Sequence, residues 1–216
     1  MYWFGIIISL YHIIFIIMNT NIQMMDCLIN LLMLEFHLIR RLWECYYCTI
    51  YGNSLMNISG LLCGLVHYFV VPLCIIYGNN NNDNNNDNNN NNCILSQKNS
   101  LFLWKSLSII IFFVANYFQF ESHLILYKLK IKYSESYTLP TDSMFKYVCC
   151  PHYLMEVLIY ISFWMSSPCS LSLICLQLWV ISNLSVVANQ NLTYYKEKFK
   201  DKYDLKNWKR IFPYLW

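Results

Sequence analysis

Six long apolar runs dominate this sequence and constrain its fold more than any other feature. They cover residues 2–18, 24–43, 54–77, 101–118, 151–167 and 170–190. A helix that crosses a bilayer needs roughly 17–25 residues, most of them apolar. Hydrophobic residues make up 57% of the 216 residues and charged residues 12%, whereas a soluble domain carries about 25% charged residues. The sequence therefore predicts an all-α integral membrane protein, a single membrane domain over residues 1–216 with about six transmembrane helices.

An asparagine tract over residues 79–92 separates the third run from the fourth. Two aspartates, Asp83 and Asp87, interrupt it. A polar tract of low complexity has no apolar surface to bury, so we expect a flexible loop without a catalytic role.

Basic residues lie almost entirely on one side of the predicted helices. If there are six spans, segments 40–53, 119–150 and 191–216 share a side with the N-terminus. These segments hold Arg40, Arg41, Lys128, Lys130, Lys132, Lys146 and the seven basic residues of the tail, whereas the other side has Lys98 and Lys105. Cytosolic loops are enriched in Lys and Arg. The pattern predicts that both termini are cytosolic and that the Asn tract is lumenal.

Several function classes find little support in the sequence. A structural zinc site needs four ligands, but the pair Cys45 and Cys48 and the segment CCPH at residues 149–152 each stand alone, so we expect no metal. None of the five glycines forms a G-x-G-x-x-G loop, so a nucleotide would not be held by a Rossmann unit. A net charge of +3 is too small to suggest nucleic acid as a partner.

Polar residues at the cytosolic ends of the runs are the candidate functional residues. Glu156 lies about one turn inside the fifth run, where a carboxylate is costly and suggests function; a structural ion pair is the alternative. Gln119 and His123 are four residues apart and so share a helix face. Arg40 and Arg41 end the second run, and Arg40 serves equally well as a topogenic charge.

Arg40, Arg41 and Glu156 fall within motifs that resemble the steroid 5α-reductase family, in particular its polyprenol reductases. RRLWEC at residues 40–45 and GLVHY at residues 64–68 resemble that branch's RRLxEC and GLVYY segments. FKYVCCPHYLME at residues 145–156, after Leu139-Pro140, resembles the family's FEYVSSPNYLAE signature. YYKEKF at residues 194–199 and the last eight residues are similar to its C-terminal end. The resemblance covers residues 37–77 and 101–216.

The resemblance implies an NADPH-dependent ene-reductase of the endoplasmic reticulum membrane, a multi-pass helical bundle that acts on a polyisoprenoid lipid in dolichol synthesis for protein glycosylation. The family's cofactor contacts, carried over position by position, are Arg41, Gln119, His123, Lys130, Tyr137, His152, Glu156 and Tyr195. Of these, Glu156, Tyr137 and Tyr195 are expected to be catalytic.

The sequence departs from the family at several of these positions. His152 replaces the usual Asn, Lys130 replaces an Arg, Thr138 stands where a second Arg is typical, and Leu192 replaces a His. The family's N-terminal catalytic acid region has no counterpart here, and we expect the chain to start after it. The proton donor is therefore open, with Tyr46, Tyr137 and His37 as candidates.

Chemistry narrows the substrate further. Hydride addition needs an electron-poor alkene, which an α,β-unsaturated carbonyl provides because charge can move onto its oxygen, where a hydrogen bond stabilises it. An allylic alcohol does not provide one. We therefore expect reduction at the polyprenal level, with polyprenol as the nominal family substrate. Two alternatives stay open: an isoprenylcysteine-type membrane methyltransferase that uses S-adenosylmethionine, and a degenerate, non-enzymatic paralogue.

Overall fold

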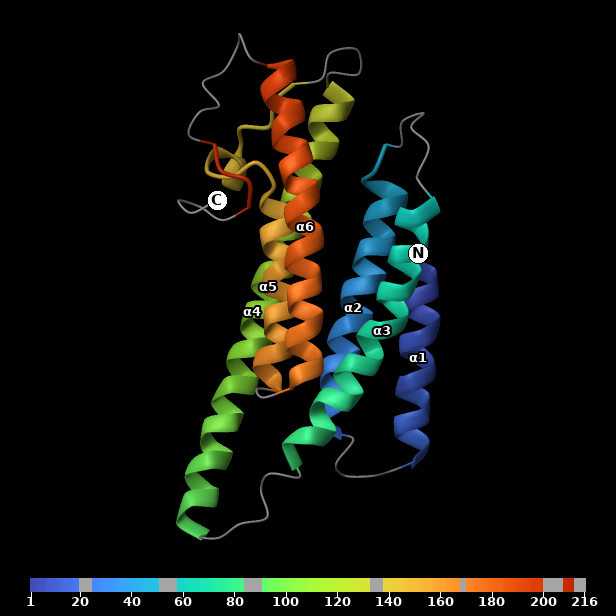
Figure 1. The fold of residues 1–216 in the computed structure, drawn as a ribbon, viewed down its shortest axis with the longest axis vertical. Coiled ribbons are helices and arrows are strands. Elements are labelled where there is room, and N and C mark those ends of the chain that lie inside the picture. Colours follow the sequence, from blue (N-terminus) through green and yellow to red (C-terminus); the bar gives the residue numbers. More distant parts are fainter. Residues whose placement is uncertain are drawn as a thin grey trace.

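The computed structural model describes residues 1–19, 25–50, 58–83, 91–132, 138–167, 170–199 and 208–211. Within these residues the chain forms a short 3-10 helix, η2, at Ser143–Lys146, and six α-helices: α1 (Tyr2–Asn19), α2 (Met25–Tyr47), α3 (Ile58–Asp83), α4 (Asn91–Lys132), α5 (Pro151–Ser166) and α6 (Leu171–Lys198). The helices run roughly along one direction in a bundle, with α1–α3 on one side and α4–α6 on the other (Figure 1).

The two halves of the bundle share one apolar core. The most extensive helix contacts are those of α4 with α5 and of α1 with α2, and α3 also packs on α6. Leu34 of α2, Ile75 of α3, Phe112 of α4 and Ile159 of α5 are fully or almost fully buried in this core. Each helix turns one apolar stripe inward, so the core joins helices that are distant in the sequence.

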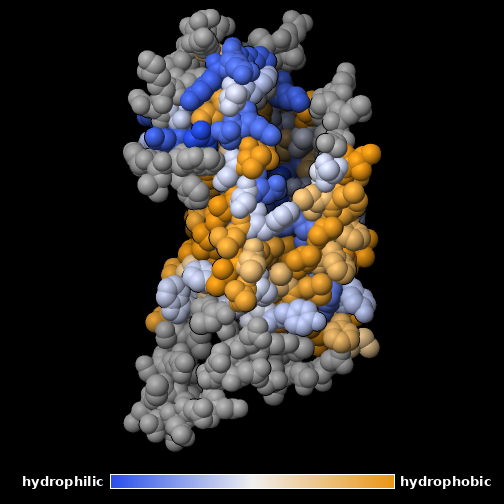
Figure 2. All heavy atoms as spheres, in the orientation of Figure 1, coloured by the Kyte–Doolittle hydropathy of each residue, from blue (hydrophilic) through white to orange (hydrophobic). Residues whose placement is uncertain are grey.

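The apolar outer surface fits a membrane. Three of the described helices are long and apolar enough to cross one, over Ile58–Gly78, Phe102–Lys132 and Leu171–Lys198, and Tyr2–Met18 is apolar but shorter. Figure 2 shows hydrophobic side chains gathered in a band across the middle of one face, with hydrophilic ones at one end. The chain is therefore an all-helical protein with at least these three candidate spans.

Helices α3 and α4 are longer than the runs that predict them. Helix α3 continues to Asp83 and α4 begins at Asn91, so both ends of the Asn tract are helical where the sequence predicted a loop. Helix α4 also continues to Lys132, well beyond the predicted end at residue 118. Polar residues such as Asn116, Gln119 and Ser122 are buried in the second half of α4, so an apolar run underestimates the length of this helix.

A C-terminal segment covers the start of α5. The backbone N–H of Cys149 donates to the carbonyl oxygen of Lys209 at 2.7 Å, and that of Cys150 donates to Arg210 at 3.1 Å. The indole N–H of Trp208 donates to the carbonyl oxygen of Phe145 at 2.7 Å. A second, smaller core lies beneath this contact and includes Leu139, Cys149, Cys150, Ala188, Leu192, Tyr195, Phe199 and Ile211.

Candidate functional site

One face of α2 carries four polar residues into the bundle. His37, Arg40, Arg41 and Glu44 are spaced three or four residues apart, which places them along one side of the helix. The side chains of His37 and Glu44 are 2% and 1% exposed, and those of the two arginines 12% and 16%. Buried charges of this kind require partners.

Glu44 balances the two arginines. Its Oε1 accepts a hydrogen bond from Arg40 Nη1, and its Oε2 accepts one from Arg41 Nη1. Arg41 also donates to the hydroxyl of Tyr2 in α1 at 3.1 Å. The carboxylate therefore compensates two cations and lets both arginines remain inside the bundle.

Helix α4 supplies the next set of partners. Arg40 donates from Nε to Oδ1 of Asn116 at 2.9 Å and from Nη2 to Oε1 of Gln119. His37 Nδ1 lies 3.1 Å from the same Asn116 oxygen. Because Arg40 uses the amide oxygen of Gln119, the amide nitrogen of Gln119 is left to donate towards α5.

Glu156 of α5 ends this hydrogen-bonded chain. Its Oε2 accepts from Nε2 of Gln119, and its Oε1 lies 3.5 Å from Nε2 of His37. Gln119 Nε2 also lies 3.3 Å from the carbonyl oxygen of His152, in the first turn of α5. The carboxylate is thus held by α2 and α4 together, and its side chain remains 20% exposed.

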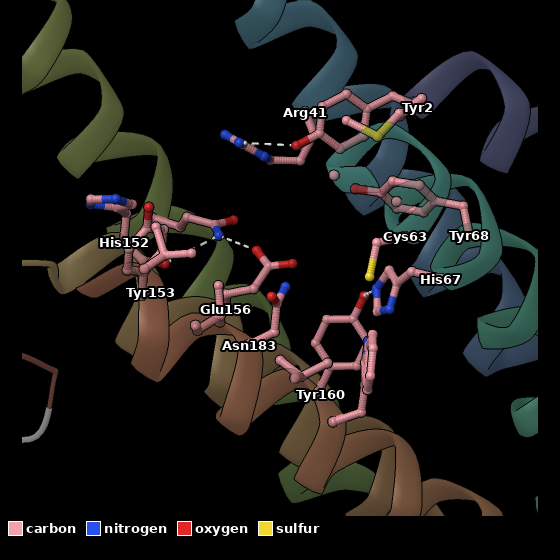
Figure 3. Close-up of a pocket in the computed structure, with 18 of the residues that line it drawn as sticks. Tyr2, Arg41, Cys63, His67, Tyr68, His152, Tyr153, Glu156, Tyr160 and Asn183 are labelled. Carbon is pink, nitrogen blue, oxygen red and sulfur yellow. Dashed lines mark hydrogen bonds between the residues drawn. The ribbon is translucent and has the colours of Figure 1, made fainter. Parts of the chain in front are cut away.

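This exposure faces a cavity of about 600 Å³ between the helices. Ligand pockets are commonly of this size, roughly 300–1,000 Å³. All six helices contribute to its wall (Figure 3). Its polar lining includes Tyr2, Arg41, His67, Gln119, His123, His152, Glu156, Tyr160 and Asn183. Val180, Leu184 and Val187 of α6 form an apolar part of the wall.

Part of the cavity wall is formed by residues that also lie on the outer surface. Gly60 of α3 and Trp179 and Asn183 of α6 line the cavity, and all three are also exposed. Both helices are candidate membrane spans.

Two histidines in the cavity wall have buried nitrogens without hydrogen-bond partners. These are Nε2 of His123 and Nδ1 of His152, whose rings lie 5.1 Å apart. The nearest acid recorded for His123 is Glu44, with Oε2 at 4.0 Å. A buried polar atom without a partner is costly. A ligand with hydrogen-bonding groups would satisfy both nitrogens.

The structure brings together most of the site residues predicted from the sequence. Arg41, Gln119, His123, His152 and Glu156 all line the cavity, although they come from three helices. Helix α2 supplies the arginine, α4 the amide and one histidine, and α5 the other histidine and the acid.

The remaining predicted residues lie elsewhere. Lys130 is exposed near the end of α4, where it donates to the carbonyl oxygen of Ile50. Tyr195 is 7% exposed and packs in the smaller core, with its ring 5.6 Å from that of Trp208. Neither residue lines the cavity. Tyr137 lies outside the described residues.

Two of the proton-donor candidates, Tyr46 and His37, are not among the residues that line the cavity. Tyr46 is 66% exposed and accepts a hydrogen bond from Trp3 at 3.1 Å. His37 is buried behind Glu156. The residues that the sequence interpretation missed are Tyr2, His67, Tyr68, Tyr160 and Asn183. A signal existed for two of them, because His67 and Tyr68 belong to the GLVHY motif.

The CCPH segment does not form a metal site in the part of the chain that the structure describes. No group of three or more His, Cys, Asp or Glu residues in those segments is arranged to hold a metal. Cys150 and Cys149 lie with their sulfurs 3.6 Å apart. This thiol–thiol contact, together with burial, raises the pKa of Cys149.

Comparisons with known proteins identify one family and several relatives. The sequence pattern of a family described as 3-oxo-5-alpha-steroid 4-dehydrogenase matches residues 88–216. A polyprenal reductase of Saccharomyces cerevisiae is 35% identical over 171 residues, which cover 77% of this chain and 57% of the yeast protein. A polyprenal reductase of Danio rerio is 28% identical over 174 residues, covering 78% of this chain and 54% of that protein. Polyprenal reductase 2 of Oryza sativa subsp. indica is 29% identical over 191 residues, with 79% and 54% coverage. The chain spans about half the length of these relatives.

Proposed function

The chain belongs to the 3-oxo-5-alpha-steroid 4-dehydrogenase family, and from this we propose that it is a membrane-embedded, NADPH-dependent reductase. Its substrate is a polyprenal, whose α-isoprene double bond it saturates in dolichol synthesis. The proposal follows the names of the relatives, which are polyprenal reductases.

The observation that carries the proposal is the convergence of Arg41, Gln119, His123, His152 and Glu156 on one cavity. These are five of the eight positions at which the family resemblance implies cofactor contacts. They come from three helices and from segments more than 100 residues apart. If these five residues served only the stability of the bundle, they would not all need to face the same cavity.

NADPH fits the groups that line this cavity. The Arg41 guanidinium offers charge to a phosphate, and the unpartnered nitrogens of His123 and His152 can meet further polar groups. Glu156 accepts hydrogen bonds and so can orient a carboxamide. When bound, NADPH supplies the hydride for reduction of a carbon–carbon double bond. The family resemblance also implies cofactor contacts at Lys130, Tyr137 and Tyr195 and catalytic roles for Tyr137 and Tyr195, but Lys130 and Tyr195 do not line this cavity. Among the residues that line it, we propose Glu156 for the catalytic role.

The proposed topology places this cavity where both reactants can reach it. We propose that all six helices span the membrane of the endoplasmic reticulum, with both termini cytosolic. The basic residues in the last turns of α4 and α6, which include Lys130 and Lys198, support this orientation. NADPH then enters from the cytosol. The polyisoprenoid tail stays in lipid beside α6, whose Trp179 both lines the cavity and is exposed.

The test combines a cellular and a purified assay. Expression in a cell that lacks polyprenal reduction should restore dolichol, measured by mass spectrometry. The purified protein with NADPH should reduce polyprenal, whereas polyprenol alone should remain unchanged. Direct saturation of polyprenol without aldehyde would refute the substrate assignment.

A thermal-stability measurement separates the two alternatives. NADPH, and not S-adenosylmethionine, should raise the unfolding temperature of the purified protein, because a ligand stabilises the state that binds it. Protection by S-adenosylmethionine would favour a methyltransferase. Good expression without dolichol and without protection by either ligand would favour the non-enzymatic paralogue.

A further inference from the structure

We propose that the hydroxyl of Tyr160, oriented by His67, binds the carbonyl oxygen of the enal substrate and stabilises the charge that develops there. This inference rests on the proposed function and names a catalytic residue for it. It assigns a role to two cavity residues outside the motif positions at which cofactor contacts are expected.

The two side chains meet across the bundle. Nε2 of His67 in α3 lies 2.7 Å from the hydroxyl oxygen of Tyr160 in α5, and the ring centroids are 5.6 Å apart. Both residues line the cavity, and Figure 3 shows them facing each other at its wall. Tyr160 is 4% exposed and packs against Phe163 in the main core. Its ring is therefore fixed from two sides.

The position of Tyr160 relative to Glu156 matters for the chemistry. The two residues are four apart in α5 and so lie one above the other on the same helix face. Glu156 is joined to the polar chain that runs through Gln119 to the arginines. Tyr160 lies one turn further along α5, and the His67–Tyr160 pair is a polar group of the wall there. A substrate carbonyl oxygen that lies beside Glu156, on the side of Tyr160, is close to this pair.

The role that we propose uses the His67 tautomer with its proton on Nε2, which leaves the Tyr160 hydroxyl free to donate. A neutral imidazole with its proton on Nε2 donates to the phenolic oxygen. The phenolic hydrogen then points elsewhere and can be given to a second acceptor. A donated hydrogen bond also polarises the hydroxyl, which strengthens the bond that it makes in turn. In this arrangement His67 donates a hydrogen bond to Tyr160, and Tyr160 can donate one to the substrate.

An enal needs such a donor during reduction. A hydride adds to C3 as NADPH is oxidised to NADP⁺. The C2=C3 electron pair shifts to form a C1=C2 enolate with negative charge on the oxygen. The enolate then returns its electrons to C2, which takes a proton from water, and the product is the saturated aldehyde. Stabilising the enolate oxygen lowers the barrier, and losing one such donor typically costs about 100- to 1,000-fold in kcat.

An infrared measurement detects the hydrogen bond between Tyr160 and the substrate carbonyl without catalytic turnover. Citral, a short enal of two isoprene units, is bound to the purified full chain without NADPH, and its carbonyl stretch is recorded by infrared spectroscopy. A donated hydrogen bond lowers this frequency. The stretch should rise towards its value in apolar solvent in Tyr160→Phe. It should stay as in the wild type in Tyr117→Phe, a matched control on the exposed face of α4. An unchanged stretch in Tyr160→Phe would overturn the inference.

A kinetic test separates this role from a structural link between α3 and α5. Tyr160→Phe should lower kcat about 100-fold or more, with the Kd for NADPH within about twofold of the wild type. His67→Leu should lower kcat as well. His67→Gln, whose amide N–H can replace that of Nε2, should recover at least tenfold over His67→Leu. A purely structural pair predicts loss of folded protein in these variants with normal turnover per folded molecule.

The outcomes also separate this inference from the function on which it rests. A folded wild-type protein that reduces neither citral nor polyprenal contradicts the proposed function. An active wild type with an equally active Tyr160→Phe variant contradicts the role of Tyr160 alone.

Discussion

At the scale of single residues, the site is organised by the way in which its charges are shared. Glu44 compensates two arginines, and Arg40 is also bonded to Asn116 and Gln119. Arg41 has fewer partners within the bundle, namely Glu44 and Tyr2, and it lines the cavity. The two neighbouring arginines therefore have different roles. Arg40 links α2 to α4, whereas Arg41 lines the cavity.

Arg41→Ala should weaken NADPH binding and leave the fold intact. Glu44 keeps Arg40 as a partner in this variant, so no carboxylate is left uncompensated. Loss of a charge-assisted hydrogen bond costs about 1.5–3 kcal/mol, so the Kd for NADPH should rise at least tenfold. The salt dependence of binding should also fall. Titration with NADPH at two salt concentrations measures both effects. Lys198→Ala, at the exposed end of α6, should change neither, and an unchanged Kd in Arg41→Ala would reduce Arg41 to a topogenic charge.

Glu156→Gln should abolish most activity without loss of folded protein. The substitution keeps the shape of the side chain and removes its charge, while Gln119 can still donate to the new amide oxygen. We expect NADPH-dependent product formation per folded molecule to fall at least about tenfold, in line with one charge-assisted hydrogen bond. The matched control is Glu197→Gln on the exposed side of α6. If Glu156 were only a structural ion pair, the variant would accumulate poorly and turn over normally.

At the scale of helices, the polar chain is what holds α2 against α4 and α5. Apolar packing provides little driving force between helices in lipid, so buried hydrogen bonds matter more there. Arg40 and His37 of α2 reach Asn116 of α4, and His37 also reaches Glu156 of α5. The groups that build the site thus also fix the relative position of three helices.

Glu44→Ala should destabilise the bundle strongly. It leaves two arginines inside the bundle without their shared acid, and breaking a buried pair costs about 3–5 kcal/mol. Thermal unfolding in detergent should show a clearly lowered midpoint. The Arg40→Ala/Glu44→Ala double variant should lose less than the sum of the single variants, because the two residues interact directly. Additive losses would contradict this coupling, and Glu197→Ala should be nearly neutral.

The sequence predicts helices better than it predicts their contacts. Each apolar run forms a helix, because apolar periodicity is a local signal. The far half of α4 was not predicted because its inward side carries Gln119 and Ser122. The five predicted cavity residues came from motif positions. The contact between His67 and Tyr160 was missed because it depends on how α3 and α5 are placed in the bundle, which no local pattern encodes.

At the scale of the whole molecule, the apolar band and the one-sided basic residues divide the bundle along its length. Figure 2 shows the hydrophilic end beyond the band. Helix α4 has 42 residues, which corresponds to about 63 Å at 1.5 Å per residue. It is therefore much longer than the ~30 Å core of a bilayer. The cavity residues lie in the half of α4 that leads to its basic end.

The Asn tract should be replaceable and lumenal. We expect activity within about twofold when residues 79–92 are exchanged for a Gly/Ser linker of equal length, because a linker of the same length closes the loop at nearly the same entropic cost. A single Asn-Gly-Ser acceptor placed in this linker should be glycosylated if it lies in the lumen. A gel shift removed by a glycosidase reports this outcome. Absence of the glycan together with loss of activity would mean that the proposed topology is inverted.

The contact between residues 208–211 and the start of α5 has a consequence for biosynthesis. The amides of Cys149 and Cys150 find their acceptors at Lys209 and Arg210, roughly 60 residues later in the chain. A ribosome adds about 5–20 residues per second. The acceptors of these amides are therefore synthesised on the order of 3–12 s after the amides themselves. During this interval the first turn of α5 lacks the segment that covers it. His152 and Glu156 are thus synthesised well before the segment that fixes their helix end, and the site matures late during translation.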